Sequence, residues 1–170
     1  MVALRFVSLF FLSSSFTVLA AHLPTRAAAS KGPPAPVFPS LTKWAESALA
    51  AVIEATDAAS LDAAFDAFLA KNVSLTINDM SISRANYIAK RQAKGFVTTS
   101  KIVYRDDMEV PTVANSSQAG MVALFFNVTI GNVIVNSGMN LVIEQEPSLL
   151  SSDPTCDARR VFNINQVETE

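Results

Sequence analysis

Apolar residues beyond residue 40 follow a helical period first and, for the most part, a strand period afterwards. Over residues 41–52 they recur every three or four positions, as on one face of a helix, and Ser40 precedes them as a candidate N-cap. A second short helix is predicted after Ser60, and a third over residues 83–94 with Ser83 as its cap. The helical part of the chain therefore lies in its first half.

Alternation of apolar and polar residues predicts strands over residues 73–78, 101–110 and 159–167. The dipeptide Gly131-Asn132 separates two apolar runs, which predicts a β-hairpin with a two-residue turn of type II′. Residues 147–158 are rich in Pro, Ser and Asp and are expected to form a loop.

The hairpin turn also fixes which residues face each other. Counting outward from the turn pairs mostly apolar residues on one face, which is therefore assigned to the core. These pairs are Val122 with Leu141, Leu124 with Met139, Phe126 with Ser137, Val128 with Val135, and Ile130 with Val133. Asn127, Phe125 and Ala123 alternate with them and are assigned to the outer face, opposite Asn136, Gly138 and Asn140.

The order helix, helix, strand, helix and then four strands predicts an α+β fold, with the helices against one face of an antiparallel sheet. Over residues 40–170 the chain resembles the nuclear-transport-factor-2-like superfamily, and within it the SnoaL-like proteins, including small secreted fungal members. The resemblance is carried by Trp44, the segment 73–88, the hairpin at Gly131-Asn132 and the ending 160–169.

This resemblance implies a curved antiparallel sheet wrapped around the N-terminal helices as a cone, often with a pocket at its open end. It also implies, for many relatives, dimers formed through the outer face of the sheet. The superfamily includes isomerases, dehydratases, cyclases, transport adaptors and binding proteins, so the fold does not select a function.

The first twenty residues have the pattern of a secretory signal peptide. Arg5 precedes an apolar run, and small residues follow it, with cleavage expected after Ala20. The serines at 13–15 leave the run too short for a membrane-spanning helix. Residues 21–39 are rich in Pro and Ala and predict a disordered linker. We therefore expect a secreted, extracellular protein without a membrane segment after the signal is removed.

Composition excludes several kinds of binding and catalytic site. The chain has 170 residues, a formal charge of −2, one cysteine and one histidine. The acidic balance argues against nucleic-acid binding. His22 lies in the linker, so no core histidine is available for a dehydratase-type His–Asp pair, and no metal site or cofactor is predicted. Cys156 is either an unpaired loop thiol or a disulfide partner for a second chain.

Three N-x-S/T sequons accompany the predicted signal peptide, at Asn72, Asn115 and Asn127, and are expected glycosylation sites. Asn127 belongs to the outer face, where Met121, Ala123 and Phe125 form a candidate homodimer seam. A glycan on Asn127 would oppose close packing of that face. Dimerisation and glycosylation of Asn127 are therefore competing predictions.

Asp106 is the candidate catalytic group. Strand alternation gives it the face of Tyr104, where an apolar surrounding would raise the pKa of its carboxyl and suit it to acid–base work. The resemblance points the same way, since ketosteroid-isomerase-like relatives use a pocket carboxylate with phenolic donors, which Tyr104 or Tyr87 would supply. The alternative is a solvated carboxylate at the end of a strand.

Three functions follow from these patterns. The first is a pocket that binds a small apolar ligand without catalysis, lined by Trp44, Phe65, Tyr104, Phe126 and Met139. The second is a cofactor-free isomerase or cyclase that uses Asp106 with a tyrosine. The third is a structural or interaction protein with a filled core. An open cavity with Asp106 outside it favours the first, and a buried Asp106 near a phenol favours the second.

Overall fold

The structure, a computed structural model, describes residues 37–93, 100–114, 116–153 and 155–169. The expected signal peptide, His22, Asn115 and most of the expected linker lie outside the described residues. The described residues belong to one unit that begins at residue 35. Within the described ranges, no helix is both long enough and apolar enough to cross a membrane.

The described residues form four helices, α1 (Leu41–Ile53), α2 (Ala58–Phe68), α3 (Arg84–Ala93) and α4 (Pro147–Ser152). The predicted caps of α1 and α3 are confirmed, because the Ser40 and Ser83 hydroxyls each accept a backbone N–H of the first turn at 3.2 Å. The helix α4 lies in the segment that was expected to be a loop, with a proline at its start.

The second helix begins earlier than predicted. The Asp57 carboxylate accepts the Ser60 N–H at 2.7 Å, and the Ser60 hydroxyl accepts the Asp57 N–H at 3.2 Å. This reciprocal pair is a capping box, in which Asp57 is the N-cap and Ser60 the third helical residue. The predicted start after Ser60 is wrong because the carboxylate three residues earlier takes the capping position.

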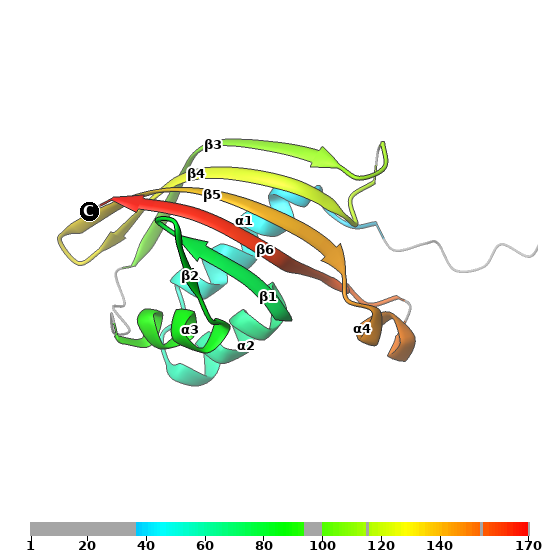
Figure 1. The fold of residues 1–170 in the computed structure, drawn as a ribbon, viewed down its shortest axis with the longest axis horizontal. Coiled ribbons are helices and arrows are strands. Elements are labelled where there is room, and N and C mark those ends of the chain that lie inside the picture. Colours follow the sequence, from blue (N-terminus) through cyan, green and yellow to red (C-terminus); the bar gives the residue numbers. More distant parts are fainter. Residues whose placement is uncertain (1–36, 94–99, 115, 154, 170) are drawn as a thin grey trace, which may run out of the picture. The chain divides into compact units, whose positions relative to one another are not determined.

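Six strands are described, β1 (Leu69–Ile77), β2 (Met80–Ile82), β3 (Lys101–Pro111), β4 (Gly120–Ile130), β5 (Val133–Gln145) and β6 (Arg159–Thr169). Their order across the sheet is β2-β1-β6-β5-β4-β3. Figure 1 shows the curved sheet arching over α1 and α2. The α+β class is confirmed, but the sheet is mixed rather than wholly antiparallel, because β6 returns alongside β1 in the same direction.

The hairpin prediction is confirmed pair by pair. Gly131 has φ +60° while Asn132 does not have a positive φ, as a type II′ turn requires. The register of β4 on β5 places Ile130 opposite Val133 and Leu124 opposite Met139, and every other predicted pair also forms. Most inward residues of both strands belong to the core, but Val133, assigned to the core face, lies beside the turn and is 52% exposed.

Two irregularities in the strand pairing, one at the edge strand β3 and one between β5 and β6, change which residues face the core. The register of β3 on β4 shifts between Tyr104 and Asp106, so Arg105 is an extra residue at a β-bulge. A second shift, between Val142 and Ile143, changes the pairing of β5 with β6. As a result Val161 faces the core together with Ile164 and Gln166, although strict alternation along the strand would place Val161 on the opposite face from them.

The strand expected over residues 73–78 is longer and has a partner that the sequence analysis missed. It begins at Leu69, directly after α2, and turns through Asn78 and Asp79 into β2. These two residues have φ values of +48° and +64°, the pattern of a type I′ turn. The turn was missed because it contains no glycine.

Candidate functional site

A cavity of about 90 Å³ lies between the concave face of the sheet and the helices, and it is open to solvent on one side. Most of its wall is apolar and comes from α1, α2, β4 and β5, including Leu49, Val52, Phe65, Phe126, Val128 and Met139. The remaining wall is polar and comes from α3, β5 and β6: Tyr87, Lys90, Arg91, Ser137, Gln166 and Glu168. An apolar concavity with a few polar groups is typical of small-molecule sites.

The space arises from the side chains that β5 turns inward. Met139 and Leu141 fill the middle of the sheet, whereas the next inward residues toward the hairpin turn are the smaller Ser137 and Val135. The helices therefore meet the sheet tightly around Leu141 and leave room near Ser137. The cavity lies at the end of the sheet where β6 finishes.

Gln166 is the centre of the polar wall and is 6% exposed. Its amide nitrogen donates to the Ser137 hydroxyl at 3.0 Å and to the Glu168 carboxylate at 3.4 Å. Its amide oxygen accepts from the Tyr87 hydroxyl at 3.3 Å. Ser137 in turn donates to the Val167 carbonyl at 3.4 Å. Each buried polar side chain of this wall thus has a partner, as burial requires.

Tyr87 brings α3 against this wall. Its ring meets Phe65 edge-on, with 5.7 Å between centroids. Burial raises the pKa of the Tyr87 phenol well above its usual range, and the nearby charge of Glu168 raises it further. The phenol is therefore neutral at physiological pH and keeps its proton for hydrogen bonding.

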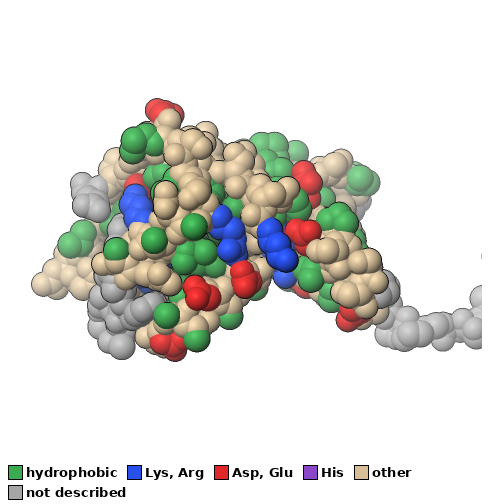
Figure 2. Space-filling view, turned by 60° about the horizontal axis from the view of Figure 1, so that its bottom comes forward, with side chains coloured by type: hydrophobic (Ala, Val, Ile, Leu, Met, Phe, Trp, Pro, Cys, Tyr) green, Lys and Arg blue, Asp and Glu red, His purple; other side chains and the backbone are tan. Residues whose placement is uncertain are grey.

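Charged side chains surround the opening of the cavity. Lys90 forms an ion pair of 2.6 Å with Glu168, and Arg91 donates to the Ile53 carbonyl at 2.6 Å. Burial lowers the pKa of the Arg91 guanidinium. On the face seen in Figure 2, basic and acidic side chains lie next to one another rather than in a patch of one sign.

Asn78 holds the end of β6 in place beside the opening. Its side chain donates to the Glu168 carbonyl at 3.2 Å and accepts the Glu168 N–H at 2.9 Å. Its own backbone N–H donates to the Gln166 carbonyl at 2.9 Å. The positive-φ turn thus fixes the backbone from which two polar wall residues project.

The five predicted ligand-lining residues divide into two groups. Phe65, Phe126 and Met139 line the cavity, whereas Trp44 and Tyr104 do not. The Tyr104 hydroxyl donates to the Glu46 carbonyl at 2.6 Å, which joins β3 to α1, and burial raises the pKa of its phenol. The ring centroids of Trp44 and Phe68 are 6.2 Å apart, and the Arg159 guanidinium stacks on the Trp44 ring.

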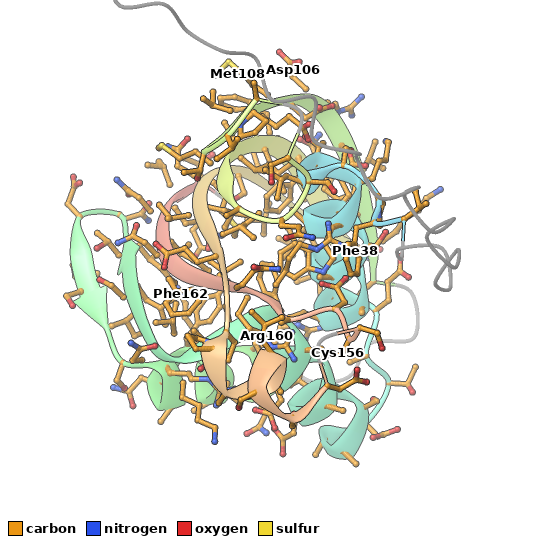
Figure 3. All side chains as sticks on the ribbon, turned by 90° about the vertical axis from the view of Figure 1, so that its right-hand side faces the viewer. Phe38, Asp106, Met108, Cys156, Arg160 and Phe162 are labelled. Carbon is orange, nitrogen blue, oxygen red and sulfur yellow. The ribbon has the colours of Figure 1, made fainter. Side chains whose placement is uncertain are left out.

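The predicted placement of Asp106 is wrong. Because Arg105 is the extra residue of the bulge, Asp106 lies opposite Phe125 on the outer face, and Tyr104 lies opposite Phe126 on the inner one. Figure 3 shows Asp106 and Met108 projecting from β3 away from the helices. Asp106 is exposed and its carboxylate accepts the Asp107 N–H at 2.9 Å. The pairing of Asp106 with Tyr104 or Tyr87 at the cavity does not form.

The other end of β6 is filled by Arg159, which is 1% exposed. Its Nε and Nη2 donate to the Asp157 carboxylate at 2.9 and 2.6 Å, and its Nη1 donates to the carbonyls of Pro39 and Ser117, both at 2.9 Å. The guanidinium also stacks on Phe38 and Trp44, 5.2 and 5.3 Å from the ring centroids. Phe38 and Pro39, assigned to the linker by the sequence analysis, therefore contact the folded unit.

Ser137, Gln166 and Glu168 line the cavity but were not predicted as site residues from the sequence. Ser137 and Gln166 both carried a usable signal, since each is a polar residue on a strand face that is otherwise apolar. In the ranges that the structure describes, no group of three His, Cys, Asp or Glu side chains could hold a metal ion.

The other predicted sites lie away from the cavity. Asn72 is exposed on β1. Asn127 is half-buried on the outer face; in the amide orientation that satisfies its neighbours, its oxygen accepts from Arg105 and its nitrogen donates to Asn136, both at 3.1 Å. Cys156 is a free, partly buried thiol 3.7 Å from the Leu149 carbonyl.

Comparisons with known proteins support the fold alone. No protein-family model matches the sequence, and no curated protein matches it. Among solved structures, an NTF-2 like protein of unknown function, PA1314 from Pseudomonas aeruginosa, matches with a TM-score of 0.54 and 11% identity, over 76% of this chain and 95% of that chain.

Mtr2 from Candida albicans matches with a TM-score of 0.54 and 9% identity, over 75% of this chain and 93% of that chain. The CaMKII hub of S. rosetta matches with a TM-score of 0.50 and 9% identity, over 79% of this chain and 98% of that chain. The chain therefore has the NTF2-like fold, as its resemblance implied.

Proposed function

We propose that this protein is a secreted glycoprotein whose cavity binds a small, mostly apolar molecule without catalysing a reaction on it. The observation that supports this proposal is the cavity itself, with an apolar floor and one polar wall. In a fully packed core we expect apolar residues at the inward positions that Ser137 and Gln166 occupy. The enzyme alternative loses its main support because Asp106 lies on the outer face.

The test begins with the native ligand. The full chain is produced in a secreting host and purified without denaturation, and mass spectrometry then identifies any small molecule that it retains. Xenon serves as a second probe, because it enters apolar cavities and changes the NMR shifts of the methyl groups that it contacts. We expect shifts at the methyl groups of Met139 and Val52, which line the cavity.

A matched pair of variants locates the binding. Val128→Phe fills the cavity, whereas Val110→Phe makes the same change on the outer face, where Val110 is 56% exposed. We expect Val128→Phe to lose the xenon shifts and Val110→Phe to keep them. If Val128→Phe is poorly folded, Val135→Leu is the smaller filling variant. Unchanged shifts in a folded filling variant, or no shifts in the wild type, would overturn the proposal.

A partner-binding role is the second candidate, and the outer face of the sheet supports it. Met108, Val110, Met121 and Phe125 are 53–62% exposed there, which is unusual for large apolar side chains on one face. Among proteins of similar fold, Mtr2 has been solved in complex with the Mex67 M domain. A second copy of this chain is the partner we infer. Measuring its size in solution before and after removal of N-glycans tests this, since a glycan on Asn127 would block the same face.

A further inference from the structure

The uncharged side chains of the polar wall, Tyr87, Ser137 and Gln166, offer a ligand hydrogen-bond acceptors rather than donors. Both N–H groups of the Gln166 amide are used, at 3.0 Å by Ser137 and at 3.4 Å by Glu168. The Ser137 hydroxyl proton is used by the Val167 carbonyl, and the Tyr87 proton by the Gln166 oxygen. What remains toward the cavity are lone pairs on the Tyr87 and Gln166 oxygens.

The charges at the opening do not change this balance. Lys90, one of two cations on α3 that line the cavity, is paired with Glu168 at 2.6 Å, so the two charges largely offset each other. The Arg91 guanidinium donates to the Ile53 carbonyl. A ligand carboxylate placed against the uncharged part of the wall would meet two acceptors and the Glu168 carboxylate, while Lys90 and Arg91 already bind protein oxygens, so its desolvation would be poorly compensated.

From this arrangement, and resting on the proposed binding function, we propose that the cavity selects a ligand whose single polar end is a hydroxyl. The hydroxyl donates to the Gln166 or Tyr87 oxygen, while the apolar part of the ligand lies against Phe126, Val128 and Met139. The wall is held ready for this contact by Asn78, which fixes the backbone of Gln166 and Glu168. Such preorganisation lowers the cost of binding.

Small probes suit the size of the cavity. About 90 Å³ is less than the roughly 150 Å³ that accommodates benzene in an engineered protein cavity, although this cavity is open on one side. We therefore choose 1-butanol, its isomer methyl propyl ether, and butyrate. The first two have the same atoms and differ in whether the oxygen carries a proton, and the third replaces the hydroxyl end with an anion.

The experiment titrates each probe into the full chain and follows the methyl resonances of Met139, Val52 and Val128. We expect 1-butanol to bind about threefold to tenfold more tightly than the ether, the range expected for one net neutral hydrogen bond. Butyrate should bind more weakly than either. In Gln166→Leu the preference for the alcohol over the ether should shrink toward equality, whereas Asn165→Leu, on the outer face of the same strand, should keep it.

The outcomes separate this inference from the proposed function. Equal affinity for the alcohol and the ether, or tighter binding of butyrate, overturns the hydroxyl preference while the binding function stands. Loss of all shifts with every probe overturns both. If Gln166→Leu does not fold, Tyr87→Phe is the second variant, because it removes one of the two acceptors without adding volume; an undiminished preference in both folded variants also overturns the inference.

Discussion

The two ends of strand β6 bury polar side chains on the same face in opposite ways. At its start, the Arg159 guanidinium is bound by a carboxylate and two backbone carbonyls and lies between two aromatic rings. At its end, the Gln166 amide is bound mainly by other side chains and lies beside a cavity. We call these the closed end and the open end.

The difference lies in what the partners can do. At the closed end Arg159 links the neighbouring Asp157 to Pro39 and Ser117, which are distant in sequence, partly through backbone carbonyls. The open end uses hydroxyl and amide groups whose hydrogen bonds are 3.0–3.4 Å long and whose remaining lone pairs lie beside the cavity. We therefore expect substitutions at the closed end of β6 to lower stability and substitutions at the open end to change ligand binding.

The largest effect is expected at the closed end from Arg159→Met. The change removes the guanidinium that donates to the Pro39 and Ser117 carbonyls. It also removes the contact of that guanidinium with the Phe38 and Trp44 rings. Unfolding in urea should show a loss of about 3 kcal/mol in the free energy of unfolding. Methyl shifts caused by xenon at the open end should persist in the folded fraction.

Arg160→Met is the matched control, because it makes the same change one residue further along β6. Arg160 is only partly buried, and its Nη1 donates to the carbonyls of its near neighbours in sequence, Asp157 at 3.3 Å and Arg159 at 2.6 Å. A loss below about 1 kcal/mol is expected. Equal losses in the two variants would contradict the special role of the closed end.

The second-largest effect on the free energy of unfolding is expected from a glycine, Gly120, at the start of β4. A Cβ added at Gly120 would lie 2.5 Å from the Val110 carbonyl oxygen and 2.8 Å from the Pro111 Cα, both of which are backbone atoms. At Gly138 the added Cβ would lie 3.3 Å from a ring atom of Phe125, which can rotate aside. Gly120→Ala should therefore lower the free energy of unfolding by about 2 kcal/mol, and Gly138→Ala by less than about 0.5 kcal/mol. Thermal unfolding of both variants measures this, and a larger effect at Gly138 would argue against it.

The sequence predicts the hairpin of β4 and β5 better than the strands on either side of it. The hairpin register followed from one dipeptide, Gly131-Asn132, because a two-residue turn leaves a single way to pair the strands. The face of Asp106 could not be predicted, since a bulge inserts a residue without a composition signal and reverses every later side chain. The candidate catalytic site was lost through that one residue.

The candidate site was only partly predictable for a related reason. Phe65, Phe126 and Met139 were found because apolar residues on an inward face either pack or line a cavity. Gln166 and Glu168 come from the last strand, whose pairing with β1 is parallel and depends on the crossover of the whole chain. The inward polar positions Ser137 and Gln166 are visible in the sequence, but their meeting with Tyr87 and Glu168 at one cavity appears only in three dimensions.

A smaller effect is expected from acid at the closed end. Burial alone would raise the pKa of the Asp157 carboxyl, but its hydrogen bonds and ion pair with Arg159 outweigh burial and hold the pKa below its ordinary value of 3.8. A lowered pKa in the folded state contributes stability that is present above pH 3.8 and is lost as the pH falls through the folded value.

Urea unfolding of the wild type and of Asp157→Asn at pH 7 and at pH 3 measures this contribution. The wild type should be the more stable at pH 7, and the difference should shrink at pH 3 because the wild-type carboxyl begins to take up its proton. A difference that grows with acid would reverse the assigned sign.

The smallest effect is expected at the open end, from Asp79→Gly in the turn between β1 and β2. Asp79 has φ +64°, where a side chain is unfavourable and glycine is not, so the change should raise the free energy of unfolding by about 0.5 kcal/mol. Asp79→Ala keeps the Cβ and should give no gain. The Asn78 contacts to Glu168 do not involve the Asp79 side chain, so 1-butanol affinity should stay within twofold of the wild type (roughly 0.4 kcal/mol). Weaker binding in the more stable variant would mean that strain in this turn, and not only the polar wall, shapes the open end.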